Sequence, residues 1–157
     1  MYKLSSGSVT YNSAMETLLK ATQLPVDDLQ DSEYQQGVQL FTLEQDEQVI
    51  GVVGIELQGD SALVRPLAVA ESERGQGLGV LLLKHAEEVA QILGVKDLYL
   101  LTTSASDFFS RMGYELMDRA SAPEPIAQSK QFAGICPSSA AFMCKQLALS
   151  LSTTNQT

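Results

Sequence analysis

The pattern of hydrophobic and polar positions is most regular between Leu63 and Leu93. Residues 63–70 are mostly apolar and have the length of a buried strand. After a short polar turn, glycines at positions 75, 77 and 79 lead directly into a segment with helical periodicity. The apolar positions of that segment are Leu78, Leu82, Ala86, Val89 and Leu93. The pattern therefore predicts a strand, a glycine turn and a long amphipathic helix, in that order.

The glycine turn, residues 75–79, has the chemistry of an anion site. Glycines let the backbone approach a ligand closely, and the unpaired amides of a first helical turn point outward at the positive end of the helix dipole. We therefore expect the turn to hold a phosphate or pyrophosphate, with a plain tight turn as the alternative. The GxGxG spacing differs from the GxGxxG dinucleotide fingerprint, and the GK[ST] ending of a Walker loop is absent.

Apolar segments before this stretch predict three consecutive strands. Residues 38–43 and 48–57, joined by polar residues 44–47, read as an antiparallel hairpin. The pair Gly59-Asp60 predicts a second tight turn, which leads into a strand over residues 62–69. Pro66 lies inside that strand and has no N–H to donate, so a bulge or a sheet edge is expected there.

The remaining segments predict shorter elements around the same sheet. A strand after the long helix implies a parallel crossover and hence a mixed sheet. Asn12 or Ser13 is expected to cap an early helix that ends before Pro25, and Ser104 to cap a later one. The other expected elements are a weak first strand within 2–11, a helix or loop at 26–35, strands at 97–103, 114–119 and 140–149, and helices at 104–112 and 126–133.

Composition limits the class of protein and its partners. A chain of 157 residues most simply forms one domain, here 1–149, followed by a disordered tail at 150–157. The net charge of −9 argues against nucleic acid or an anionic membrane as partner. Without a long apolar run or a signal-peptide pattern, the protein is expected to be soluble and cytoplasmic. Cys136 and Cys144 are expected to be reduced thiols; His85, the only histidine, argues against a His-rich metal site and is expected to be solvated.

The segment Arg74-x-x-Gly77-x-Gly79 resembles the coenzyme A site of the GNAT superfamily of N-acetyltransferases. This resemblance implies acetyl-CoA as the cofactor. It also implies an α+β or α/β fold, with a mixed, mostly antiparallel sheet of six to seven strands, a bulged central strand and flanking helices. The residues expected to bind the cofactor are Leu67, Ala68, Val69, Arg74, Gly75, Gln76, Gly77, Leu78, Gly79, Phe108 and Phe109.

Residues 102–114 carry a second resemblance to this family, with one departure. Family members often have Asn-x-x-Ala-x-x-aromatic-Tyr-x-x-x-Gly-Phe here, and the matching positions are Thr102, Ala105, Phe108, Phe109, Gly113 and Tyr114. Where many members have a tyrosine that protonates the leaving thiolate, this chain has Phe109, which cannot donate a proton. Core packing is the alternative role of Phe108 and Phe109.

Five segments together are similar to the arsenic-resistance type of N-acetyltransferase, a branch related to the acetylating domain of N-acetylglutamate synthase. They are GDSALVRPLAV, RGQGLG, LYLLTTSASDFF, RMGYE and FAGICPSSA, within residues 18–147. The resemblance implies an N-acetyltransferase that acts on the amino group of an amino acid or an analogue. Glutamate-like acceptors, including arsenical or phosphinic mimics, are the expected substrates.

Two charged residues in apolar strands are the candidates for the acceptor chemistry. An ammonium must lose a proton before it attacks, and Glu56 is the expected base, directly or through water; a solvated strand-end carboxylate is the alternative. Arg65 is expected to hold a substrate carboxylate, the alternative being an internal ion pair with Glu56 or Asp60. Backbone amides of residues 67–69 are expected to stabilise the oxyanion. The side chains expected to complete the acceptor pocket are Thr102, Thr103, Phe132 and Ser139.

The sequence favours direct transfer from the thioester to the amine. Neither cysteine has a neighbouring histidine or helix start to lower its pKa, which disfavours a covalent intermediate on Cys136 or Cys144. A non-catalytic acyl-CoA sensor is a rival, because the cofactor turn is intact while the usual tyrosine is missing. A protein or peptide N-acetyltransferase is a further rival. The acceptor and the formation of a homodimer are left open by the sequence.

Overall fold

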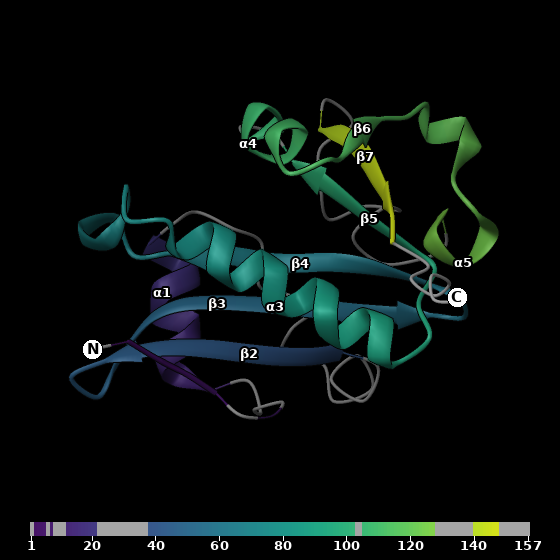
Figure 1. Ribbon diagram of the computed structural model, residues 1–157. Helices are drawn as coiled ribbons and strands as arrows, with labels where there is room; N and C mark the ends of the chain where they lie inside the picture. Colours follow the sequence, from purple (N-terminus) through teal and green to yellow (C-terminus); the bar gives the residue numbers. More distant parts are fainter. Residues whose placement is uncertain are drawn as a thin grey trace, which may run out of the picture. The chain divides into compact units, whose positions relative to one another are not determined.

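The computed structural model describes residues 2–5, 7, 12–21, 38–102, 105–127 and 140–147 (Figure 1). In this part of the chain, seven strands are hydrogen-bonded in the order β1-β2-β3-β4-β5-β7-β6. They are β1 (Tyr2–Leu4), β2 (Val38–Gln45), β3 (Gln48–Gln58), β4 (Ser61–Val69), β5 (Asp97–Thr102), β6 (Glu115–Leu116) and β7 (Ala141–Gln146). The helices are α1 (Ser13–Ala21), α3 (Leu78–Ile92), α4 (Ser106–Arg111) and α5 (Glu124–Ala127), with 3-10 helices at Glu71–Glu73 and Arg119–Ser121.

The predicted mixed, mostly antiparallel sheet with flanking helices is confirmed. The pair β4 and β5 is parallel, with Ser61, Ala62 and Leu63 opposite residues 97–99. The pairs β1–β2, β2–β3, β5–β7 and β6–β7 are antiparallel. The β2–β3 ladder shifts register between Leu43 and Glu44. The bulge expected at Pro66 in β4 stays a prediction.

The chain divides into two compact units. The first comprises Met1–Glu56 and Val64–Ala86, and the second Leu57–Leu63 and Glu87–Thr157. The elements β3, β4 and α3 cross this division and contribute residues to each unit. The single domain expected over residues 1–149 stays a prediction.

In the first unit, the alternation of side chains along β2 and β3 places helices on opposite faces of the strands. One face packs against α1; its apolar core comprises Met15, Leu18, Leu19, Val38, Leu40, Val52 and Ala68. The opposite face meets α3, because a Cβ on Gly51 would lie 2.8 Å from Leu82. Figure 1 shows α1 behind these strands and α3 in front of them. The period of two along each strand explains both contacts.

His85 corrects the expectation of a solvated side chain. Its ring lies edge-on to the buried ring of Phe41, with centroids 4.8 Å apart. The Nε2 atom is buried and has no hydrogen-bond partner among the described residues. The expectation was wrong because Phe41, on β2, lies on the face of the sheet that α3 covers. The apolar pattern of α3 alone does not show how much of the helix surface the sheet contacts.

The N-terminal elements follow the sequence closely. The Oδ1 atom of Asn12 accepts a hydrogen bond from the amide of Met15 at 3.1 Å, so Asn12 caps α1. The weak first strand is confirmed as three residues, and Tyr2 lies opposite Gln45 of β2. The segment 26–35, expected to be a helix or loop, lies outside the described residues.

The second unit is built around β5, which pairs with the first residues of β4 and with all of β7. On one face, the rings of Tyr99 and Phe142 stack with centroids 5.4 Å apart. They form a core with Leu63, Leu101, Ile126 and Ala140. The helix expected at 126–133 is observed as α5, which begins two residues earlier, and its predicted residues 128–133 lie outside the described residues.

The strand predicted over residues 114–119 is mostly wrong. Only Glu115 and Leu116 form β6, and a 3-10 helix begins at Arg119. The Asp118 side chain accepts a hydrogen bond from the amide of Ala120 at 3.1 Å, and this local bond turns the backbone out of the extended conformation. The start of α4 also differs. Thr102 Oγ1 accepts from the Ala105 amide at 3.0 Å, whereas the expected cap at position 104 lies outside the described residues.

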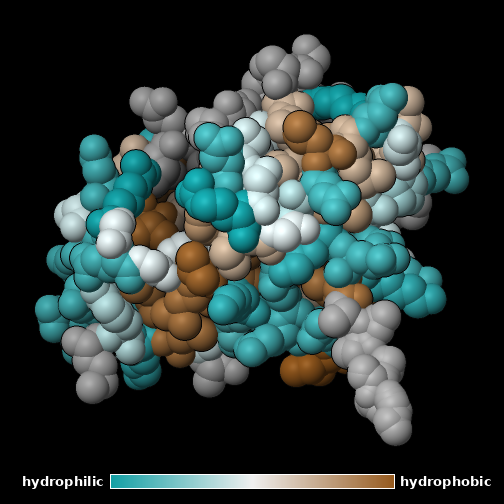
Figure 2. Space-filling view, turned by 45° about the horizontal axis from the view of Figure 1, so that its top comes forward, coloured by the Kyte–Doolittle hydropathy of each residue, from teal (hydrophilic) through white to brown (hydrophobic). Residues whose placement is uncertain are grey.

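Few large apolar side chains are exposed among the described residues. In the face drawn in Figure 2, hydrophobic residues (brown) form several areas separated by hydrophilic ones (teal). The large exposed apolar side chains are Leu81, Ile92, Leu93 and Leu116. Within the described ranges, no helix combines the length and apolar character needed to span a membrane. Scattered apolar side chains are ordinary on protein surfaces, so we assign them no role.

Candidate functional site

The glycine turn forms an open loop between β4 and α3. The amide of Ala70 donates to the Ile50 carbonyl at 2.7 Å and ties the start of the loop to β3. Gly75 and Gly77 have φ values of 85° and 80°, which favour glycine. A Cβ built on either residue meets nothing within 4 Å. These glycines are therefore required by backbone conformation, and the space beside them is open to a ligand.

The backbone amides of this loop are available to an anion. Among the described residues, the N–H groups of positions 75–79 donate to no other residue. The first helical hydrogen bond runs from the Leu81 amide to the Gly77 carbonyl at 3.1 Å. The first turn of α3 contains no acidic residue that could compete for these amides. Together with the helix dipole, the loop can bind a phosphate or pyrophosphate.

Arg74 adds a positive charge at the same loop. Its Nε donates to the carbonyl of Val69 at 3.3 Å, which anchors the side chain to the end of β4. No ion pair joins Arg74 to a carboxylate in the described part of the chain. Its charge is therefore not neutralised there, and it suits an anionic ligand.

Sequence analysis did not find Tyr2 and Glu73 as residues of the loop site, whereas Gln76, which contacts both, was expected there. The hydroxyl of Tyr2, in β1, donates to Gln76 Oε1, and Gln76 Nε2 donates to Glu73 Oε1 at 3.2 Å. This chain of hydrogen bonds links the N-terminal strand to the glycine loop. Tyr2 and Gln76 are 74 residues apart in sequence, so no local pattern could reveal the contact.

Glu56 and Arg65 are both buried in the first unit. Their exposed fractions are 4% and 3%, and they lie on the neighbouring strands β3 and β4. The strands approach closely here, since a Cβ on Gly54 would lie 2.6 Å from the carbonyl oxygen of Arg65. Such burial requires compensation of each charge. Solvated Glu56, one alternative from the sequence, is excluded by this burial. Asp60, named as another partner for Arg65, is exposed and lies 3.9 Å from Lys96.

The residues of β4 that were expected to bind the cofactor differ in how deeply their side chains are buried. Ala68 belongs to the core against α1, while Leu67 and Val69 are half-buried. Leu78 is buried at the first turn of α3. A role for the backbone amides of residues 67–69 stays a prediction.

The aromatic pair of α4 lies in the second unit and packs internally. Phe109 is buried, and its ring makes edge contacts with Phe108 and Tyr114 at centroid distances of 5.1 and 5.7 Å. These contacts are compatible with the alternative of core packing, and the expected cofactor role of Phe108 and Phe109 stays a prediction. Thr102 is engaged at the start of α4, as described above. Thr103, Phe132 and Ser139 lie outside the described residues.

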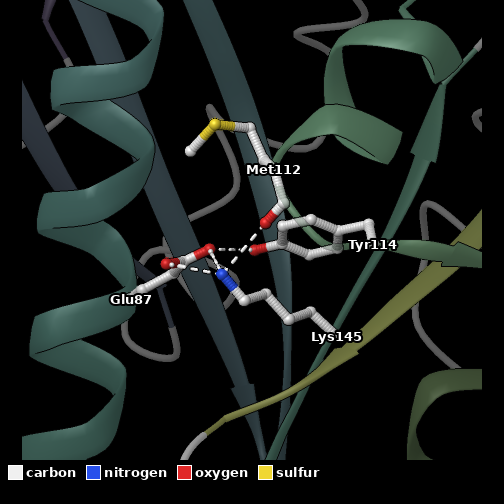
Figure 3. Close-up of polar contacts among 4 residues, drawn as sticks. All are labelled: Glu87, Met112, Tyr114 and Lys145. Carbon is white, nitrogen blue, oxygen red and sulfur yellow. Dashed lines mark hydrogen bonds and ion pairs between the residues drawn. The ribbon is translucent and has the colours of Figure 1, made fainter.

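A cluster of polar groups in the second unit joins α3, the end of α4 and β7 (Figure 3). Lys145 Nζ lies 3.1 Å from Glu87 Oε2 and donates to the carbonyl of Met112 at 3.0 Å. The hydroxyl of Tyr114 donates to Glu87 Oε2 at 2.9 Å. Burial, together with the carboxylate of Glu87, raises the pKa of Tyr114 far above its usual value. The phenol is therefore a hydrogen-bond donor throughout the physiological range.

Cys144 is unsuited to nucleophilic catalysis. Burial is the main cause that raises the pKa of its thiol to about 11, and the carboxylate of Asp97 adds to the effect. At neutral pH this residue is a neutral thiol, and the thiolate is the reactive form. The other cysteine, at position 136, lies outside the described residues.

A family profile and a curated relative that match this chain are both described as acetyltransferases. A profile of the acetyltransferase (GNAT) domain family matches residues 36–116. A relative described as an uncharacterized N-acetyltransferase, from Chlorobaculum tepidum, is 40% identical over 80 residues, or 50% of this chain and 51% of the relative. The chain thus matches about half the length of this curated relative.

Solved structures extend the likeness to most of the chain. A GNAT-family acetyltransferase from Staphylococcus aureus matches with a TM-score of 0.74 and 17% identity, over 94% of this chain and 100% of that one. N-acetylglutamate synthase from Neisseria gonorrhoeae, complexed with coenzyme A and N-acetyl-glutamate, matches with a TM-score of 0.73 and 16% identity. That match covers 94% of this chain and 35% of the synthase. These likenesses confirm the predicted fold.

Proposed function

The chain belongs to the GNAT acetyltransferase family, and we propose that it transfers the acetyl group of acetyl-CoA to the amino group of a small amino acid or amino-acid analogue. The observation that carries the proposal is the glycine loop. Five consecutive amides, at positions 75–79, have no partner among the described residues, and Arg74 lies beside them. A pyrophosphate carries the charge and the acceptor oxygens that such a loop binds.

In the proposed reaction the amine attacks the thioester carbonyl directly. The ammonium form of the acceptor first loses its proton to Glu56, either directly or through a water molecule. Backbone amides of residues 67–69 donate hydrogen bonds to the oxyanion as it forms. The sulfur leaves as a thiolate and is protonated by a group other than Phe109, whose side chain has no proton to give. The raised pKa of Cys144 supports direct transfer over a covalent intermediate on that residue.

Within the class of amino acids and analogues, we propose that the acceptor is glutamate-like. Arg65 is buried within β4, and a guanidinium forms two parallel hydrogen bonds with a carboxylate. The sequence likeness to the arsenic-resistance type of N-acetyltransferase favours the same substrate class, including arsenical and phosphinic mimics. N-acetyl-glutamate in the complex of the Neisseria synthase is a compatible precedent.

A non-catalytic acyl-CoA sensor is the second candidate, favoured by Phe109 in place of the usual tyrosine. The two candidates differ in turnover. Release of CoA from acetyl-CoA in the presence of amino acids and analogues, with each product identified by mass, supports the enzyme. Binding of acetyl-CoA without turnover of any amine or peptide supports the sensor.

The cofactor site is tested by Gly77→Asp, with Gly59→Asp as the matched control. Both glycines have positive φ, at 80° and 66°, and open space around a Cβ, so the substitutions impose a similar backbone cost. Only Gly77→Asp places a carboxylate among the loop amides. We expect calorimetric titration to show CoA binding by the wild type and Gly59→Asp but not by folded Gly77→Asp. Equal affinity in all three proteins contradicts the assignment.

A further inference from the structure

The side chain of Gln76 has a hydrogen-bond partner at each of its two polar atoms. Its Oε1 accepts from the hydroxyl of Tyr2, and its Nε2 donates to Glu73 at 3.2 Å. Gln76 is exposed and Tyr2 half-buried, so neither contact is needed to fill a core. The amide group uses one donor and its acceptor in this chain, which fixes its orientation.

The contact also restrains a carboxylate next to an anion site. Glu73 ends a 3-10 helix that contains a second acid, Glu71, and the loop amides begin two residues later at Gly75. Successive backbone N–H groups bind a carboxylate as well as a phosphate. Within a protein of net charge −9, a released Glu73 carboxylate would therefore compete with an anionic ligand for those amides.

We propose that Tyr2 and Gln76 are positioning residues for the cofactor loop: they hold the Glu73 carboxylate aside and leave the amides of residues 75–79 open to the pyrophosphate of CoA. This inference rests on the proposed function, because the loop must be the CoA site. It gives the N-terminal strand β1 a part in cofactor affinity. The strand reaches the loop through one hydroxyl and supplies no group to the cofactor itself.

The central variant is Tyr2→Phe, which removes the hydroxyl and keeps the ring. Tyr99→Phe is the matched control, because it makes the same chemical change in the second unit, where the ring stacks on Phe142. Gln76→Leu interrupts the same chain at an exposed position and provides an independent variant. We expect the Kd for CoA, from calorimetric titration, to rise about 3–10-fold in Tyr2→Phe and in Gln76→Leu, as the loss of a neutral hydrogen bond predicts. Tyr99→Phe should retain the wild-type Kd.

Recovery of CoA affinity in a double variant distinguishes a positioning role of Tyr2 and Gln76 from a merely structural one. Glu73→Gln removes the competing charge, so the double variant Tyr2→Phe/Glu73→Gln should recover the wild-type Kd, with thermal midpoints close to those of the single variants. Persistent weak binding in the double variant overturns the proposal. If the wild type binds CoA and both Tyr2→Phe and Gln76→Leu have the wild-type Kd, the positioning role of Tyr2 and Gln76 is contradicted, but the proposed cofactor site is not. If the wild type does not bind CoA, the proposed cofactor site falls and takes this inference with it.

Discussion

At the scale of single residues, Phe109 and Arg65 bear on two separate steps of the proposed reaction. The sequence resemblance aligns Phe109 with a proton-donating tyrosine, and its ring contacts the rings of Phe108 and Tyr114. In the proposed reaction, the proton for the leaving group therefore comes from another group. Arg65 is a guanidinium with an exposed fraction of only 3%. Burying such a group costs free energy unless an anion compensates it, so the identity of that anion decides the role of the residue.

Arg65→Lys tests whether that anion is the acceptor's carboxylate. Lysine keeps the charge and loses the two-pronged hydrogen bonding, so the KM of a carboxylated acceptor should rise about tenfold or more, while the KM of acetyl-CoA stays nearly constant. Arg111→Lys, at an exposed position of α4, is the control. Steady-state kinetics with an amino acid and its decarboxylated amine provide the measurement. A preference for the simple amine, or equal effects on both substrates, identifies Arg65 as part of an internal ion pair.

Residue roles were predictable where they depend on neighbours in sequence. The cap at Asn12, expected at Asn12 or Ser13, and the glycine turn at residues 75–79 both follow from local backbone chemistry. The burial of His85 depends on Phe41, which lies on a different element. The contact of Tyr2 likewise depends on pairing between distant strands, which composition and spacing do not encode.

At the scale of elements, length and periodicity determined which predictions succeeded. The hairpin of β2 and β3 and the helix α3 have long apolar patterns, and their observed bounds lie close to those predicted. β6 is two residues long, too short for a pattern of period two to be read, and the bond within its following turn ended the strand early. The glycine loop was predictable because strand, turn and helix are contiguous.

The polar cluster on α3 and β7 should stabilise the second unit more than a surface ion pair does. In Lys145→Met, Glu87 loses its cation and the Met112 carbonyl loses a donor, and side-chain exposures are only 29% for Lys145 and 13% for Glu87. We expect a loss of about 1–2 kcal/mol in the free energy of unfolding, measured by urea denaturation. Lys96→Met is the control. Lys96 is 73% exposed in its pair with Asp60, and its loss should change stability by less than about 0.5 kcal/mol. Equal effects of the two variants would show that the cluster contributes nothing beyond an ordinary surface pair.

At the scale of the whole molecule, the division into two compact units raises the question of whether they unfold together. The division runs through β3 after Glu56, through β4 after Leu63 and through α3 after Ala86, so each unit holds part of the same two strands and the same helix. Unfolding of the second unit alone would remove the last part of α3 and leave residues 78–86, a helix too short to be stable without tertiary packing. It would also unfold residues 61–63 of β4, while residues 64–69 of the same strand stay in the first unit.

We therefore expect one cooperative unfolding transition, as the predicted single domain requires. Differential scanning calorimetry should give a single peak whose van't Hoff and calorimetric enthalpies agree. Lys145→Met, although it alters only the second unit, should move that entire peak to lower temperature, by about 2–6 °C for a chain of this size. Two peaks, with only one displaced by Lys145→Met, would identify independent domains. In that case the shared elements β3, β4 and α3 would not couple the units. The cofactor loop, which lies in the first unit, should then still bind CoA at temperatures where the second unit has unfolded.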